Sequence, residues 1–204
     1  MEMAGDVQRA PQCGIWGDFV KLTQMAFIGV AALSLLFLAF AMYPKPEEKP
    51  VVFFAYGSNL EISTMRARAG GAENATPAIL HGYRLVFQTN RDSEFGVANA
   101  IPDQTSSVAG AIYVLAPEQA KMLDKGSGVP DFYQKISITA EQRGGATLIA
   151  VTHVLSGTPS FAPPSRPIVL ALSKGLQQFG YNQSEQDKIA AAASEAQQKS
   201  GRGS

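Results

Sequence analysis

An uninterrupted apolar run near the N-terminus divides this chain into two unequal parts. Residues 25–43 read MAFIGVAALSLLFLAFAMY and carry no ionisable side chain before the final tyrosine. At a rise of about 1.5 Å per residue, a helix of this length crosses a hydrocarbon core of about 30 Å. Aromatic and basic residues suited to the membrane interface flank the run: Trp16, Lys21, Tyr43 and Lys45. We therefore predict a single transmembrane helix over 22–43.

The competing interpretation of the run is a cleaved export signal. Ala39-Phe40-Ala41 has the small-x-small pattern of a cleavage site. The preceding segment, however, carries Glu2, Asp6 and Asp18, whereas an export signal begins with a basic region. This charge pattern favours a membrane anchor. Basic residues are equally sparse on both sides of the run, so the sequence does not fix the side of the membrane on which the soluble part lies.

The charge balance excludes one large class of partners. The 204 residues hold 17 basic and 17 acidic side chains, which gives no net charge. Electrostatic binding of nucleic acid needs a concentrated excess of Lys and Arg, so no nucleic-acid partner is predicted. The single Cys13 excludes an intrachain disulfide, and the sequence shows no metal-ligand spacing or phosphate-binding glycine motif. We predict no metal and no cofactor.

The composition predicts five segments. They are a polar tail over 1–21, the transmembrane helix over 22–43, a proline-rich linker over 44–50, a folded domain over 51–181, and a polar, alanine-rich tail over 182–204. Short β-rich runs dominate the domain and are separated by turn residues: 51–56, 78–88, 96–101, 108–115, 133–139 and 147–155. Helices are predicted over 60–69, 117–123 and 168–179. This pattern predicts an α+β domain with a mixed or mostly antiparallel closed sheet.

The most specific local pattern is Tyr56-Gly57-Ser58-Asn59-Leu60, where the first strand runs directly into a turn and a helix. One interpretation is a ligand site, because Gly57 lets a ligand approach the backbone and helix-start amides attract carboxylates or phosphates. The other is purely structural. Ser58 and Glu61 have the spacing of a capping box, in which the two side chains satisfy each other's free amides. Both interpretations stay open on local physics.

Several motifs in order resemble the gamma-glutamylcyclotransferase superfamily. Phe54-Ala55-Tyr56-Gly57-Ser58-Asn59-Leu60 is similar to its signature loop. Later blocks keep the family's order and approximate spacing: 78–87, 96–102, 108–115, 123–133 and 164–175. The resemblance covers about Val52 to Tyr181. It implies a small mixed β-barrel with flanking helices, preceded in this chain by the predicted transmembrane helix.

The resemblance also implies a reaction, and this chain differs from the family at one residue which that reaction needs. In active members the signature loop, here Tyr56 to Leu60, holds the α-carboxylate and amine region of a γ-glutamyl group. A glutamate then acts as general acid/base while the substrate's own amine attacks its γ-carbonyl, giving 5-oxoproline and a free amine. In this chain Ser127 stands at the position of that glutamate. A serine hydroxyl without an adjacent base does not take up a proton at neutral pH, and losing a general base lowers the rate by about 10²–10⁴-fold.

No other residue is predicted to replace the glutamate. Asp124 and Asp131 are the nearest acids, but Asp124 matches an ordinary position of the family pattern and Asp131 follows a proline in a predicted turn. His81 and His153 are interpreted as ordinary strand residues whose nitrogens are satisfied. His153 stands where an aromatic side chain is common in the family, and Ile168 where tyrosine is.

Three functions are therefore weighed. The preferred one is a single-pass, membrane-anchored pseudoenzyme that serves as an accessory subunit of a larger membrane complex. The alternatives are an active gamma-glutamylcyclotransferase acting on a γ-glutamyl amine or peptide, with Asp124, Asp131 or a substrate carboxylate as the base, and a non-catalytic binder of small carboxylates. The predicted partners are a membrane, other subunits of the complex and a γ-glutamyl small molecule.

Overall fold

A computed structural model describes residues 48–72 and 74–201. The polar tail and the run predicted to cross a membrane, residues 1–43, lie outside this part of the chain. Within the described residues, every helix is too short or too polar to span a bilayer.

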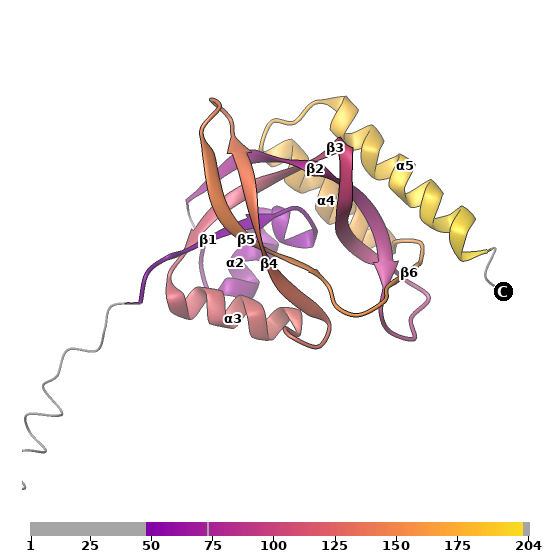
Figure 1. Cartoon of the computed structure of the whole chain (residues 1–204), viewed down its shortest axis with the longest axis horizontal. Coiled ribbons are helices and arrows are strands. Elements are labelled where there is room, and N and C mark those ends of the chain that lie inside the picture. The colour runs from indigo at the N-terminus through magenta and orange to yellow at the C-terminus, as the bar shows by residue number, and fades with distance from the viewer. Residues whose placement is uncertain (1–47, 73, 202–204) are drawn as a thin grey trace, which may run out of the picture. The chain divides into compact units, whose positions relative to one another are not determined.

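Five strands close into a mixed β-barrel, as the sequence predicts (Figure 1). The barrel strands are β1 (Val51–Ala55), β2 (Ala75–Thr89), β3 (Val97–Leu115), β4 (Tyr133–Gln142) and β5 (Thr147–Leu155). A sixth, short strand, β6 (Ser160–Phe161), lies outside the closed barrel. The order β3-β1-β5-β4-β2 is closed by pairing of β2 with β3. β1 and β5 run parallel, and the other strand pairs are antiparallel. β6 extends the sheet beside β2.

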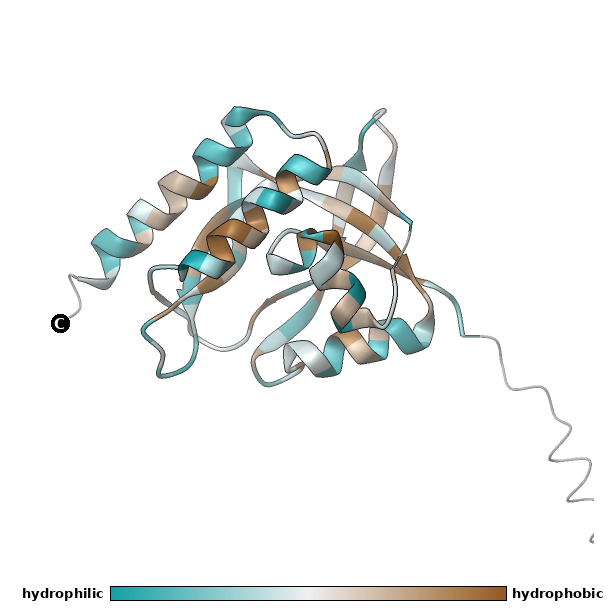
Figure 2. Ribbon diagram, turned by 180° about the vertical axis from the view of Figure 1, so that it is seen from behind, coloured by the Kyte–Doolittle hydropathy of each residue, from teal (hydrophilic) through white to brown (hydrophobic). Residues whose placement is uncertain are grey.

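Helices flank the barrel. They are a 3-10 turn η1 (Ser58–Leu60) and the α-helices α2 (Ile62–Ala69), α3 (Pro117–Ser127), α4 (Arg166–Gln178) and α5 (Gln183–Ser200). The hydropathy colouring of Figure 2 shows a run of apolar residues in α4. In α4 the buried residues Leu172, Gly175 and Leu176 follow the spacing of one helix face.

The core joins the barrel to these helices. β1 contributes Phe53, Phe54 and Ala55, all buried, which agrees with the short apolar run in the sequence. Tyr113 in β3 packs edge to face on Phe179, with ring centroids 6.3 Å apart. β1 pairs with β3 on one side and β5 on the other, so the strand end from which the next loop begins is held in place.

Two segments differ from the expected elements. The predicted strands 96–101 and 108–115 form one long strand, β3, because the residues between them continue the pairing with β2 past a register shift beside Gly82. The polar segment after the predicted domain end at Tyr181 forms α5, which buries Ile189, Ala192 and Ala196 against the core. The folded unit therefore includes α5.

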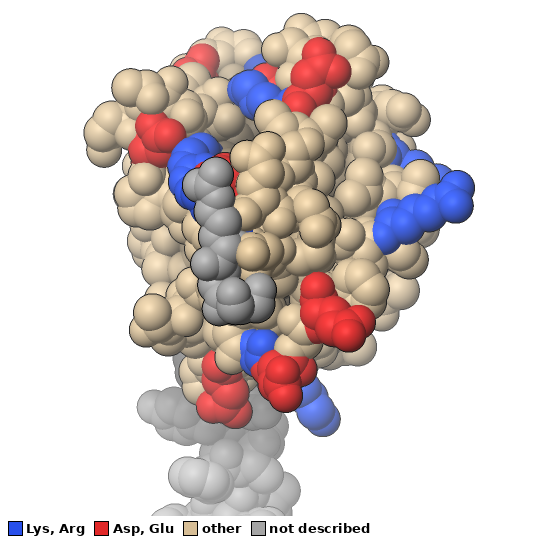
Figure 3. All heavy atoms as spheres, turned by 90° about the vertical axis from the view of Figure 1, so that its right-hand side faces the viewer, with Lys and Arg blue, Asp and Glu red and all other residues tan. Residues whose placement is uncertain are grey.

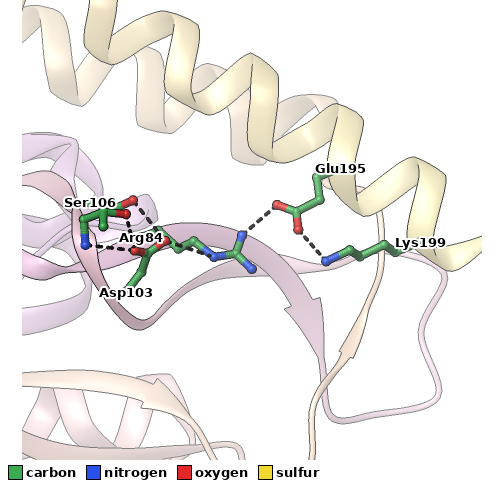
Figure 4. A network of polar contacts seen from close by, with 6 residues as sticks. Arg84, Asp103, Ser106, Glu195 and Lys199 are labelled. Atoms are coloured by element: carbon green, nitrogen blue, oxygen red, sulfur yellow. Dashed lines mark hydrogen bonds and ion pairs between the residues drawn. The ribbon is translucent and has the colours of Figure 1, made fainter.

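A polar network fastens α5 to the barrel (Figure 4). Glu195 on α5 accepts a hydrogen bond from Arg84 of β2 at 2.7 Å and one from Lys199 at 2.6 Å. Arg84 also lies 3.7 Å from Asp103 of β3. Elsewhere on this side of the molecule, Figure 3 shows acidic and basic side chains interspersed rather than gathered by sign.

We expect Glu195→Gln to destabilise the protein by about 0.5–1 kcal/mol at neutral pH, because the pairs are partly exposed. The hydrogen bond from Lys199 and the charge of Arg84 lower the pKa of Glu195 in the folded protein. The stabilisation is therefore full above the unfolded-state pKa and is lost as the pH falls through the folded-state pKa. Thermal unfolding should separate wild type from variant at pH 7 and not at pH 3. An equal difference at both pH values would refute a charge-based role for Glu195.

Candidate functional site

The loop after β1 forms one wall of a recess in the barrel. Of the predicted binding residues, Tyr56, Gly57, Ser58 and Asn59 line this recess, while Leu60 is buried in the core instead. The recess has an empty volume of about 360 Å³, part of it open to solvent. Its opposite walls come from distant parts of the chain: Ser127 of α3, Tyr133 of β4 and His153 of β5. The predicted signature loop and Ser127 are thus brought together.

Tyr56 ties the loop to two strands. Its hydroxyl donates a 2.6 Å hydrogen bond to the carbonyl of His153 and accepts one from the amide of Ala100. Burial raises the pKa of Tyr56 far above its ordinary value, so the hydroxyl stays protonated. Tyr133 is similar, because burial raises its pKa to about 12. Tyr56 holds the loop in place and Tyr133 offers the recess a neutral hydroxyl.

Gly57 keeps this part of the loop open because it has no side chain. Its φ of −95° is accessible to other residues. A Cβ at this position would meet the Cβ of Ala98 at 3.5 Å, which is ordinary contact. A larger side chain would therefore occupy the recess rather than distort the strand.

The capping-box interpretation of Ser58 and Glu61 is wrong. Among the residues that the structure describes, no side-chain hydrogen bond caps η1 or α2. Arg68 of α2 instead donates hydrogen bonds to Ser58 Oγ at 3.0 Å and to Asn59 Oδ1 at 2.7 Å. Glu61 accepts from Thr64 and from Lys174 of α4. Arg68, which the sequence did not single out, thus orients both short polar side chains of the loop.

α4 also packs against the end of this loop, at Leu60 and Glu61. A Cβ on Gly175 would lie 2.7 Å from Leu60 Cγ and 2.9 Å from the amide nitrogen of Glu61. Only a glycine allows α4 to pack this closely against η1.

Ser127 ends α3 beside the recess, and its Oγ is buried without a hydrogen-bond partner among the described residues. A buried polar atom without a partner carries a desolvation penalty of about 1–3 kcal/mol, so such atoms mark places where a ligand or water completes the bonding. The recess is therefore suited to a polar molecule.

The interpretation of His153 as an ordinary strand residue with satisfied nitrogens is wrong. His153 is 6% exposed and lies in β5, where it lines the recess. Its Nε2 lies 2.9 Å from Asp124 Oδ1, but its Nδ1 is buried and has no partner in the described part of the chain. Its ring lies edge to face on Phe53 and stacks with Tyr133. The contact between Asp124 and His153 could not be predicted from sequence spacing, because the two residues are 29 positions apart.

The two acids considered as bases have different surroundings. Asp124 of α3 contacts His153 and also accepts a hydrogen bond from Lys135 of β4 at 2.7 Å. Asp131 is exposed in the turn between α3 and β4. The other histidine, His81, is exposed on β2 with its Nε2 3.1 Å from Glu141, so its ordinary role is confirmed for that nitrogen.

An outer groove continues from the recess and shares Ser58, Arg68, Ser127 and Tyr133 with it. Its charged lining residues are Arg68, Arg91, Lys125 and Glu61. Glu61 is paired with Lys174 at 3.1 Å. Arg91 lies over the Phe132 ring, 4.1 Å from its centroid. The excess of positive charge at this entrance favours an anionic ligand.

Comparison with known proteins gives a consistent result. Residues 53–167 match the family described as gamma-glutamyl cyclotransferase, AIG2-like. A human gamma-glutamylcyclotransferase is 24% identical over 152 residues, which cover 72% of this chain and 80% of that protein. A mouse gamma-glutamylcyclotransferase is 25% identical over 151 residues, with 71% and 80% covered. A solved gamma-glutamyl cyclotransferase structure superposes with a TM-score of 0.64 at 22% identity and covers 70% of this chain and 88% of its own.

Proposed function

Because this chain belongs to the gamma-glutamyl cyclotransferase, AIG2-like family, we propose that its recess binds the γ-glutamyl group of a small amine or peptide. The observation that carries the proposal is the recess itself, which is lined by the signature loop and by two residues, Ser127 and His153, whose buried Oγ and Nδ1 atoms have no partner among the described residues. A recess filled by apolar side chains would instead favour a vestigial site.

The charges around the recess support a carboxylate ligand. Arg68 lies beside Ser58 and Asn59, and Arg91 and Lys125 line the outer groove. In this proposal the α-carboxylate of the γ-glutamyl group lies at the signature loop near Arg68, and the leaving amine extends toward the outer groove. Arg91 and Lys125 in the outer groove favour a second carboxylate on that amine, as in a γ-glutamyl dipeptide.

Titration calorimetry of the full chain with γ-glutamylalanine tests the proposal. We expect Gly57→Ala to weaken binding and Gly57→Val to weaken it at least about tenfold, because side chains of increasing size enter the recess. The ligand control is α-glutamylalanine, which has the same atoms but the wrong linkage, and we expect it to bind more weakly. Equal binding of the two dipeptides, or none by either, would contradict the proposal.

The predicted membrane anchor and the accessory role are also proposals. The apolar run 25–43 supports the anchor, and resistance of the full chain to alkaline extraction from membranes tests it. Ser127 at the glutamate position supports an inactive subunit of a membrane complex. That role requires stoichiometric partners that co-isolate with the chain, and it gives no reason for a recess with unpartnered polar atoms.

A further inference from the structure

The recess contains a proton-accepting group that the family resemblance does not imply. We propose that His153, held by Asp124, is the general base of a γ-glutamyl cyclisation in this chain and replaces the glutamate that Ser127 has displaced. This inference rests on the proposed binding of a γ-glutamyl group in the recess. It makes the chain an enzyme rather than a binder alone.

The hydrogen bond to Asp124 determines which nitrogen of His153 can accept a proton. Nε2 lies 2.9 Å from the carboxylate oxygen of Asp124, and a carboxylate only accepts hydrogen bonds. Nε2 therefore carries the proton, and Nδ1 carries the free lone pair. Nδ1 is also the nitrogen that has no partner in the described ranges 48–72 and 74–201, and His153 lines the recess. The lone pair is thus left without a partner among the described residues, in a side chain that borders the recess.

The surroundings keep this imidazole neutral at physiological pH. Burial lowers the pKa of His153, and the hydrogen bond and charge of Asp124 oppose that effect only in part. Lys135 of β4, which pairs with Asp124, disfavours the charged imidazolium as well. Tyr56 after β1 and Tyr133 of β4 also line the recess; their pKa values are raised, so they stay neutral, and Arg68 of α2 adds a positive charge to the same lining. A neutral base is what the reaction needs in order to take up a proton.

The proton and bond changes balance. Nδ1 of His153 takes one proton from the substrate's α-ammonium group, which becomes a nucleophilic amine. The amine nitrogen forms a bond to the γ-carbonyl carbon and loses a further proton to solvent. The imidazolium then gives its proton to the leaving nitrogen as the old carbon–nitrogen bond breaks. The products are 5-oxoproline and a free amine, which takes up the solvent proton, and His153 returns to its neutral form.

Asp124 acts as a positioning residue in this scheme. It fixes the tautomer of His153 and stabilises the transient imidazolium, while Lys135 holds its second carboxylate oxygen at 2.7 Å. Asp124 and Ser127 lie three residues apart on α3, so they lie on the same side of the helix, and Ser127 lines the recess. The signal in the sequence was therefore this i, i+3 pair together with a histidine in place of an aromatic residue.

The test is release of 5-oxoproline from γ-glutamylalanine by the full chain and three histidine variants. We expect His153→Gln and His153→Phe to lower turnover at least about 100-fold, because each removes the base. Gln can keep a hydrogen bond to Asp124, and Phe can keep the ring contacts with Phe53 and Tyr133. The matched control is His81→Gln, an exposed histidine outside the recess, which should leave turnover unchanged.

A second readout separates the chemical role from a structural one. Turnover of the wild type should rise with pH through a pKa below the ordinary value for histidine and be level at neutral pH. In Asp124→Asn the imidazolium loses its carboxylate, so turnover should fall and the rising limb should move to lower pH. A merely structural role for Asp124 would lower turnover without moving the limb.

Binding and turnover together distinguish the possible failures. If calorimetry shows binding of γ-glutamylalanine but the wild type releases no 5-oxoproline, the base proposal is overturned and the binding proposal stands. The same holds if both His153 variants keep wild-type turnover. If γ-glutamylalanine does not bind, the proposed function fails and this inference fails with it.

Discussion

Gly110→Ala is expected to destabilise the protein by about 3 kcal/mol, at the upper end for an overpacked core. A Cβ on Gly110 of β3 would lie only 2.5 Å from the carbonyl oxygen of Ala55 and well inside contact distance of the Phe54 ring. Phe54 is fully buried, so its ring has no free space to enter. The carbonyl of Gly110 also accepts a 2.7 Å hydrogen bond from Tyr181, which anchors the segment between α4 and α5 to β3. Urea unfolding of the full chain measures the effect.

The matched control is Gly126→Ala. Gly126 lies in α3, and apart from its own helix turn no described residue has an atom within 4 Å of an added Cβ, so alanine should stabilise the helix by about 0.5–1 kcal/mol relative to glycine. The double variant Gly110→Ala/Phe54→Leu should be destabilised by less than the sum of the two single variants, because leucine leaves room for the added Cβ. A Gly110→Ala protein as stable as the wild type would show that β3 and β1 do not approach as closely as the structure has them.

The strands of this fold were predictable because their determinants are local. β1 follows from an apolar, β-branched run, and β4 and β5 each sit between turn residues. β3 was predicted as two strands because Pro102 and the polar residues after it resemble a loop. They are held in strand conformation by pairing with β2 and by contacts such as Arg84 with Asp103, which are not local. Non-local contacts also explain α5. Its few apolar residues stabilise a helix because they pack against the barrel.

The signature-loop part of the candidate site was also predictable from local sequence. The signature loop is contiguous in sequence, so its pattern and its resemblance to a family could be seen together. The pairing of Asp124 with His153 spans 29 residues and depends on the parallel pairing of β5 with β1, which brings the β5 residue to the end of β1. Sequence spacing alone gives no information about such a contact. Arg68 was missed because a basic residue on a short, polar helix resembles an ordinary solvated one.

Restoring the family's glutamate should recover turnover in a chain that lacks His153. In the His153→Gln background, Ser127→Glu places a carboxylate at the end of α3, beside the recess and opposite the signature loop. We expect release of 5-oxoproline from γ-glutamylalanine to rise by about 10²–10⁴-fold over His153→Gln alone, which is the usual contribution of a general base. Ser127→Gln in the same background is the control, because it has the same shape and accepts no proton at neutral pH.

The pH profile of the double variant identifies which group takes the proton. Partial burial should raise the pKa of the new carboxyl above its ordinary value, so turnover should rise with pH through that carboxyl pKa rather than through the histidine pKa of the wild type. In the wild-type background the gain from Ser127→Glu should be smaller, because His153 already accepts the proton and the two groups would pair. If Ser127→Glu does no better than Ser127→Gln in the His153→Gln chain, position 127 does not face the reacting amine. The base must then act from the β5 side of the recess.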